Sequence, residues 1–159
     1  EMRPREEWGH EGADEVRFMF RPAQGMQCRP LSRIASGGEL SRVMLALHVV
    51  MGDRDGVPTL VFDEVDAGVG GATALALGDV LAELASTHQV LVVTHLAQVA
   101  ALADRQYVVR KVTDDESAYT VIEEALGDKR AEEVARMLSG AMTDSSLAHA
   151  RELLGRRTC

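Results

Sequence analysis

The sequence predicts an α/β fold: a mainly parallel sheet flanked by helices, with a β-hairpin toward the end of the chain. Leu60, Val61 and Phe62 are apolar without alternation, which is typical of a strand covered on both faces. A second apolar run, residues 89–93, predicts a neighbouring strand. Helical patterns at residues 72–85 and 96–103 alternate with these runs, so we expect right-handed crossovers between parallel strands.

The N-terminal third contains weaker signals. Residues 1–12 are charged and include Pro4 and two glycines, which favours an irregular connector. Val16, Phe18 and Phe20 alternate with less apolar positions and predict a half-buried strand, followed by a loop over residues 21–30. From residue 36 onward the spacing predicts a helix with one buried apolar face, formed by Leu40, Val43, Met44, Leu47 and Met51.

The remaining elements complete one domain. Residues 53–58 predict a turn before the Leu60 strand. Residues 106–112 and 118–123 flank a polar turn at residues 114–117 and predict an antiparallel hairpin. Two short amphipathic helices follow at residues 131–138 and 145–154, with Gly155 as the expected C-cap.

Composition narrows the classes of protein. At 159 residues and 46% hydrophobic, the chain is large enough for one sizeable core. We expect neither a secretory signal nor an apolar run that could span a bilayer. Cys28 and Cys159 form no Cys-x-x-Cys pair, and we expect them to be incidental thiols in a reducing cytoplasm. The net charge of −8 disfavours a general DNA-binding surface. The arginines near the glycine-rich segment and near the end of the chain are expected at the solvated surface: Arg29, Arg33, Arg42, Arg151, Arg156 and Arg157.

Carboxylates follow the apolar run that begins at Leu60. Asp63 and Glu64 come directly after it, and Asp66 lies two residues further on. Ligands bind at the carboxyl ends of the strands in open α/β sheets, where one carboxylate can hold Mg²⁺ and its neighbour can orient a water. The alternative interpretation is a strand that ends in a solvated acidic turn.

A second candidate for phosphate contact is the segment Ser36, Gly37, Gly38 and Glu39, which opens the expected helix. Two glycines allow a ligand to approach the backbone, and the helix N-terminus favours an anion. A simple capped helix, with Ser36 as N-cap and Glu39 as capping-box partner, is the alternative. The P-loop pattern Gly-x-x-x-x-Gly-Lys-Ser/Thr is absent, because neither Lys111 nor Lys129 follows a glycine.

His95 is the third candidate, since it follows the second apolar run and is expected at the same sheet edge. With all three motifs in view, the sequence resembles the C-terminal half of the head domain of ABC-type ATPases of the SMC-like branch. Residues 34–47 resemble the signature motif, residues 62–75 the Walker B and D-loop, and residues 92–100 the switch-histidine region. The run Gly68 to Gly71 favours a bacterial DNA-repair member over condensin or cohesin subunits.

The resemblance implies a role for each motif residue. Asp63 would bind Mg²⁺, and Glu64 would polarise the water that attacks the γ-phosphate of ATP. Ser36, Gly37 and Gly38, with Glu39, would contact ATP held by a second head. Asp66 would lie at the dimer interface, and His95 would touch the γ-phosphate.

The resemblance also implies partners and a domain division. Residues 1–13 would be a connector from a coiled coil that is absent from this chain, and residues 14–159 the C-terminal lobe. An N-terminal half of the same head would supply the Walker A loop and the adenine pocket, a second head would complete an ATP-dependent homodimer, and DNA would bind the full-length protein in the bacterial cytoplasm, at the nucleoid. The chain alone is expected to have negligible ATPase activity. Two alternatives remain open: a head segment of another SMC-like or ABC ATPase, and a non-catalytic interaction module.

Overall fold

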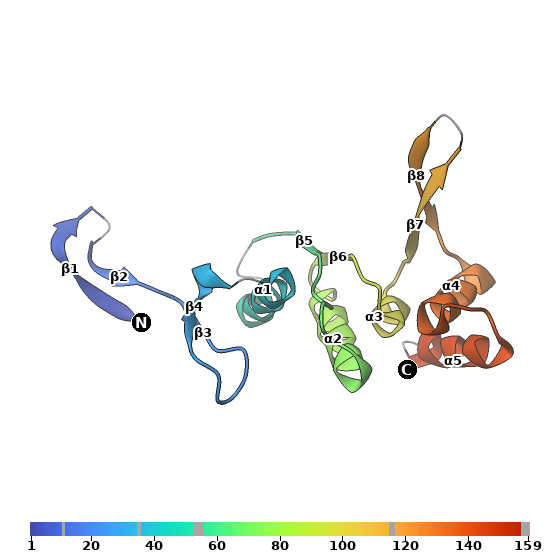
Figure 1. Ribbon diagram of the computed structural model, residues 1–159, viewed down its shortest axis with the longest axis horizontal. Helices are drawn as coiled ribbons and strands as arrows, with labels where there is room; N and C mark the ends of the chain where they lie inside the picture. Colours follow the sequence, from blue (N-terminus) through green and yellow to red (C-terminus); the bar gives the residue numbers. More distant parts are fainter. Residues whose placement is uncertain (11, 35, 53–55, 115–116, 157–159) are drawn as a thin grey trace.

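The computed structural model describes residues 1–10, 12–34, 36–52, 56–114 and 117–156 of the chain. Several expectations lie outside these residues: Ala35 of the glycine-rich segment, the first residues of the turn at 53–58, the tip of the hairpin at 115–116, Arg157 and Cys159. In Figure 1 the elements follow one another along the long axis, from the β1–β2 hairpin at one end to α4 and α5 at the other.

The centre of the fold is a parallel strand pair. β5 (Thr59–Phe62) pairs with β6 (Gln89–Val92), with Phe62 opposite Val92, and α2 (Gly71–Leu84) forms the crossover between them. α1 (Gly37–Met51), α2 and α3 (Ala97–Leu102) contribute to the core that covers this pair. The core members are Leu45, Leu60, Phe62, Val65, Leu77, Leu81, Leu84 and Val99. The strands, the crossover and the helix after β6 were therefore correctly predicted.

The sheet itself differs from the prediction. The described strands form four two-stranded sheets, and only β5–β6 is parallel among them, so a mainly parallel sheet is not what the structure shows. The expectation that β5 is covered on both faces is also wrong. Leu60 and Phe62 are buried, whereas Val61 between them is 66% exposed, because the core packs on one face of the pair. Leu91 and Val93 are also exposed, at 49% and 61%.

α1 begins where the sequence predicted but is covered differently. Of the expected apolar face, Leu40, Met44, Leu47 and Met51 are 40 to 43% exposed. Leu45 is instead the buried hydrophobic residue of the helix. Periodicity identified side chains that share a face; Val43 on this face is half-buried, but the described elements leave the other four side chains exposed.

The N-terminal region is more ordered than predicted. β1 (Met2–Gly9) and β2 (Gly12–Val16) form an antiparallel hairpin, so residues 2–9 are a strand and not an irregular connector. The expected domain boundary between residues 13 and 14 falls inside β2. The single strand predicted around Phe18 is wrong: the chain leaves β2 at Val16, Phe18 is 73% exposed, and β3 (Met19–Phe20) pairs with β4 (Arg29–Pro30) before the short helix η1 (Leu31–Arg33).

A second cluster lies at the other end of the molecule. α4 (Gly127–Ser139) and α5 (Asp144–Gly155) pack with α3 around Val134, Ala135 and Ala150. Gly155 is the last residue of α5 and the C-cap is Arg156, one residue later than expected. The predicted hairpin is present as β7 (Tyr107–Thr113) and β8 (Ala118–Glu124), which projects away from the helices in Figure 1.

Arg130 joins this cluster to α3. Its Nη2 donates to the carbonyls of Ala100, Ala101 and Ala103 at the C-terminal end of α3, at 3.2, 3.3 and 2.7 Å. Burial lowers the pKa of this guanidinium from its ordinary value. Among the described helices, none has the length and apolar character to cross a membrane.

Candidate functional site

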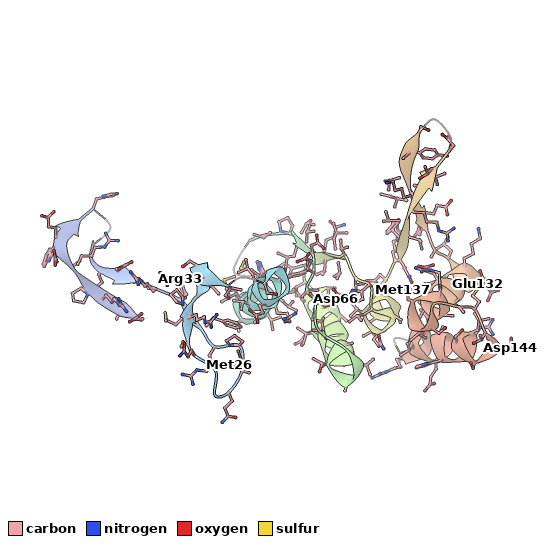
Figure 2. All side chains as sticks on the ribbon, in the orientation of Figure 1. Met26, Arg33, Asp66, Glu132, Met137 and Asp144 are labelled. Carbon is pink, nitrogen blue, oxygen red and sulfur yellow. The ribbon has the colours of Figure 1, made fainter. Side chains whose placement is uncertain are left out.

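The three sequence motifs meet at the carboxyl edge of β5 and β6. Asp63 and Glu64 follow the last residue of β5, and His95 lies three residues beyond the end of β6. The N-terminal turn of α1 lies against the same edge, because Ser41 Oγ donates to the carbonyl of Asp63 at 2.7 Å. Figure 2 shows Asp66 in this central part of the molecule. The predicted convergence is therefore present.

Ser36 begins α1 as its N-cap. Its hydroxyl accepts a hydrogen bond from the backbone N–H of Glu39 at 3.5 Å, and its backbone is extended, as N-cap residues usually are. Glu39 lies in the first turn, where its charge is favourable to the helix dipole. The capped-helix interpretation is thus correct for Ser36, and it is compatible with a role in binding phosphate.

Gly37 and Gly38 allow the loop after β5 to approach α1. A Cβ built on Gly38 would lie 2.7 Å from Ala67 Cβ and 2.8 Å from the carbonyl oxygen of Glu64. A Cβ on Gly37 would collide with the carboxylate of Glu64, which therefore lies against the N-terminal turn of α1. Packing within this chain therefore requires glycine at position 38, whereas at position 37 the exposed end of the Glu64 side chain could move aside.

The loop from Asp63 to Gly70 is held by hydrogen bonds. Glu64 has a φ of 56°, in the left-handed region that a non-glycine residue rarely adopts. Ala67 N–H donates to Glu64 O at 3.0 Å, which closes a tight turn. Arg42 Nη1 donates to the carbonyls of Val65 and Ala67 at 3.1 and 2.8 Å, so the expectation of a solvated Arg42 is wrong.

Asp66 is buried at 2% exposure and contacts the segment after β6. Its Oδ2 accepts from the hydroxyl of Thr94, from the backbone N–H of His95 at 3.0 Å, and lies 3.1 Å from His95 Nδ1. The Thr94 hydroxyl in turn accepts from the N–H of Leu96 at 3.0 Å. The His95 side chain itself is 72% exposed. The loop after β5 and the segment after β6 are therefore connected within one chain.

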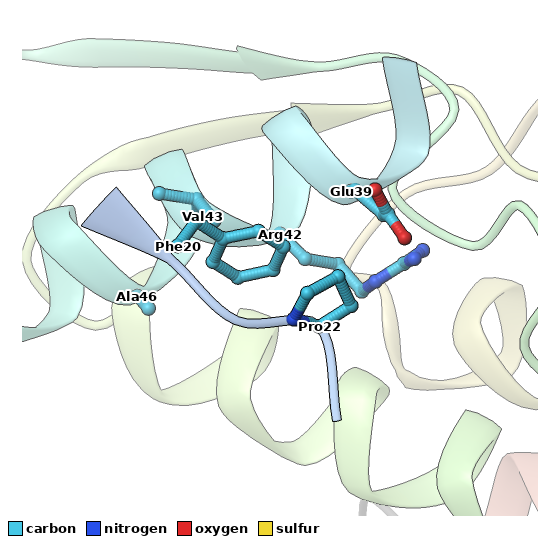
Figure 3. Close-up of a pocket in the computed structure, with 6 residues that line it drawn as sticks. All are labelled: Phe20, Pro22, Glu39, Arg42, Val43 and Ala46. Atoms are coloured by element: carbon cyan, nitrogen blue, oxygen red, sulfur yellow. The ribbon is translucent and has the colours of Figure 1, made fainter. Parts of the chain in front are cut away.

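The sequence interpretation missed three residues of this arrangement: Ser41, Arg42 and Thr94. Ser41 and Arg42 lie one helical turn after the glycines, which is the signal that could have placed them beside the loop. Thr94 directly precedes His95 at the end of the second apolar run, and this position is the signal that could have drawn attention to it. Glu39 lies on the other side of the cap, in the wall of a pocket of about 230 Å³ between α1 and the β3 segment, lined by Phe20, Pro22, Glu39, Arg42, Val43 and Ala46 (Figure 3).

The carboxylates at this edge suit a metal ion that is shared with phosphate. Among the described residues, no three His, Cys, Asp or Glu side chains gather closely enough to form a protein-only metal site. Mg²⁺ is usually held by one or two carboxylates together with waters and substrate phosphates. Asp63, exposed at the carboxyl end of β5, fits that kind of site and would be its protein ligand.

Two solved structures of SMC proteins are among the matches to the chain. No protein-family model matches the chain. A solved structure from work on ATP-driven dimerization and DNA-stimulated activation of SMC ATPases is similar with a TM-score of 0.46 and 21% identity, over 75% of this chain and 70% of that one. The SMC head domain from Thermotoga maritima has a TM-score of 0.43 and 31% identity, over 61% of this chain and 36% of that one.

The curated relatives that match the chain include several DNA repair proteins RecN. The chain is 51% identical over 148 residues to the DNA repair protein RecN of Streptomyces coelicolor, covering 92% of this chain and 26% of the relative. Identity to RecN of Deinococcus radiodurans is 52% over 143 residues, covering 90% and 25%. RecN of Treponema pallidum is 48% identical over 147 residues, covering 92% and 26%. The chain is thus homologous to RecN over about nine-tenths of its own length, and it spans about a quarter of the length of these relatives.

Proposed function

We propose that this chain is the C-terminal segment of the ATPase head of a RecN-like DNA repair protein, which acts on DNA double-strand breaks in the bacterial cytoplasm. The observation that carries the proposal is the convergence at one edge of α1's glycine-opened N-terminus, the Asp63–Glu64 pair and His95. The homology to RecN supports it independently. The activity belongs to the completed head, which binds and hydrolyses ATP.

Asp63 and Glu64 have different tasks in this proposal. Asp63 would hold Mg²⁺, which would supply charge neutralisation at the phosphates. Glu64 is exposed one residue further on, where its carboxylate can accept a hydrogen bond from the water that attacks the γ-phosphate. The hydrogen bonds of this loop hold the Glu64 backbone close to α1.

The start of α1 contacts ATP that is bound by a second head. The amides of Gly37 and Gly38 lie at a helix N-terminus, where the dipole favours an anion, and the Ser36 hydroxyl can donate to a phosphate oxygen. Glu39 supports this turn as its first-turn carboxylate. Asp66 lies in the loop at this interface and His95 reaches the γ-phosphate, so that nucleotide joins two copies of the head.

The exposed apolar surfaces support the proposal that a further segment of the head packs on this chain. Val61 and Leu91 leave one face of β5–β6 exposed, and α1 exposes the face that contains Leu40, Met44 and Leu47. Exposed apolar surface of this extent is typical of an interface. We assign it to the N-terminal half of the same head, which carries the Walker A loop and the adenine pocket. A coiled coil would join this half to the present chain, and DNA would bind elsewhere on the full-length protein.

The variant Glu64→Gln tests the assignment in a completed head. It removes the proton-accepting carboxylate and leaves Asp63 and the α1 turn in place. We expect loss of ATP hydrolysis, with ATP-dependent association of heads retained. Glu83→Gln is the matched control, because Glu83 is an exposed glutamate on α2 away from the edge. An unchanged rate of hydrolysis in Glu64→Gln would contradict the role of Glu64.

A further inference from the structure

The buried carboxylate of Asp66 lies against the imidazole of His95. His95 is the residue whose ring the proposed mechanism places against phosphate. We propose that Asp66 is a positioning residue for His95, which holds the imidazole with Nδ1–H toward the protein and Nε2 toward the solvent edge. The consequence for phosphate sensing rests on the proposed function, but the ring orientation does not.

Burial and hydrogen bonding fix the position of Asp66. The residue is 2% exposed, and its Oδ2 accepts from the Thr94 hydroxyl and from His95 N–H at 3.0 Å. The backbone of the segment after β6 is therefore hydrogen-bonded to Asp66 Oδ2. The same oxygen lies 3.1 Å from His95 Nδ1. By contrast the His95 side chain is 72% exposed, so its outer edge is accessible to a ligand.

The chemistry of the two groups favours one tautomer. An ionised carboxylate only accepts hydrogen bonds, so its place 3.1 Å from His95 Nδ1 favours a hydrogen on that nitrogen. In the neutral ring Nδ1 is then protonated and Nε2 has the lone pair, since the bond made by one nitrogen determines the state of the other. A phosphate oxygen is also an acceptor, so His95 can contact phosphate through Nε2 only as the doubly protonated imidazolium. Asp66 balances that charge from the protein side.

A purely structural role for Asp66 is the competing explanation, because the same oxygen also holds Thr94 and the His95 backbone. The variant Asp66→Asn separates the two. Its amide oxygen can still accept from the Thr94 hydroxyl and the His95 N–H, so the loop can be retained. Its neutral oxygen is a weaker acceptor, and its NH₂ can donate to Nδ1, so the preference for the Nδ1–H tautomer is lost.

The test is the tautomer of His95, measured by ¹⁵N NMR on this chain without nucleotide, with the signal identified by His95→Gln. We expect the Nδ1–H tautomer in the unmodified chain, retention in Thr94→Val, and a shift toward Nε2–H in Asp66→Asn. His88, whose Nδ1 lies 2.8 Å from the Thr87 hydroxyl, is the internal reference and should not change. A predominant Nε2–H tautomer in the unmodified chain, or an identical tautomer ratio in Asp66→Asn, would overturn the proposal.

A second measurement connects the orientation to activity. In the completed head, Asp66→Asn and His95→Gln should each lower the rate of ATP hydrolysis, and the double variant should be no slower than His95→Gln. Additive losses would show that Asp66 does not act through His95. If the completed head hydrolyses no ATP, the proposed function fails while the NMR result still decides the orientation.

Discussion

Replacing Gly38 by alanine tests the close approach of α1 to the loop after β5. The new Cβ would lie 2.7 Å from Ala67 Cβ, 2.8 Å from the Glu64 carbonyl oxygen and 3.2 Å from Arg42 Nη1. The nearest of these atoms are a short side chain and a backbone oxygen, and the loop that carries them is fixed by Arg42 and Ser41. Relief of the overlap therefore requires the loop and the helix to separate.

Two opposing effects determine the size of the loss. Inserting a methyl group into a well-packed contact costs about 1 to 3 kcal/mol. Alanine is favoured over glycine within a helix by up to about 1 kcal/mol, and this gain is smaller in the first turn. The packing cost exceeds the helix-propensity gain, so we expect a net loss of about 1 to 2 kcal/mol in the free energy of unfolding.

Urea unfolding of this chain, followed by circular dichroism, measures the loss. With a slope of about 2 kcal/mol per molar urea, the midpoint should fall by about 0.5 to 1 M. Gly155→Ala is the matched control, because Gly155 is the last residue of α5 and a Cβ there meets nothing within 4 Å. A Gly38→Ala variant as stable as the Gly155→Ala control would refute the packing argument.

Three further changes test other parts of the structure by the same measurement. Arg42→Ala should cost about 1 to 3 kcal/mol, because the carbonyls of Val65 and Ala67 lose a charged donor; Arg33→Ala, at an exposed arginine on η1, should stay within about 0.5 kcal/mol. Leu81→Ala should cost about 2 to 5 kcal/mol, since Leu81 is 5% exposed in the core, whereas Val50→Ala, at 84% exposure, should change little. Thr143→Ala should cost about 1 kcal/mol, because it removes the acceptor for Ser146 N–H in the capping box of α5; an unchanged midpoint would show that the box contributes nothing.

The sequence predicted the parts of the fold that depend on local pattern. The apolar runs at Leu60 and Val90 became β5 and β6, and the glycines after Ser36 marked the start of α1. The convergence of Asp63 and His95 followed from the rule that parallel strands share a carboxyl edge. These inferences required no knowledge of what covers each element.

The burial of each helix face and the contacts between residues far apart in sequence could not be predicted in the same way. Periodicity placed Leu40 and Met44 on one face, but whether that face is buried depends on a partner element, and the described chain provides none. The bonds from Asp66 to His95 join residues 29 apart in sequence, and they depend on how two loops fold back on each other. β1 was missed because half of residues 2–9 are charged and the segment contains Pro4, while its strand is defined by pairing with β2.

Mixing this chain with the proposed N-terminal half of the head tests the central claim most directly. This chain would be mixed with a polypeptide that carries the N-terminal, Walker A-containing half of a RecN head, and ATP hydrolysis would be measured with Mg²⁺. We expect negligible hydrolysis by either part, hydrolysis by the mixture, and loss of that hydrolysis with Glu64→Gln. Hydrolysis by this chain alone, or a mixture whose rate does not depend on Glu64, would contradict the claim that Asp63 and Glu64 form half of a composite ATPase site.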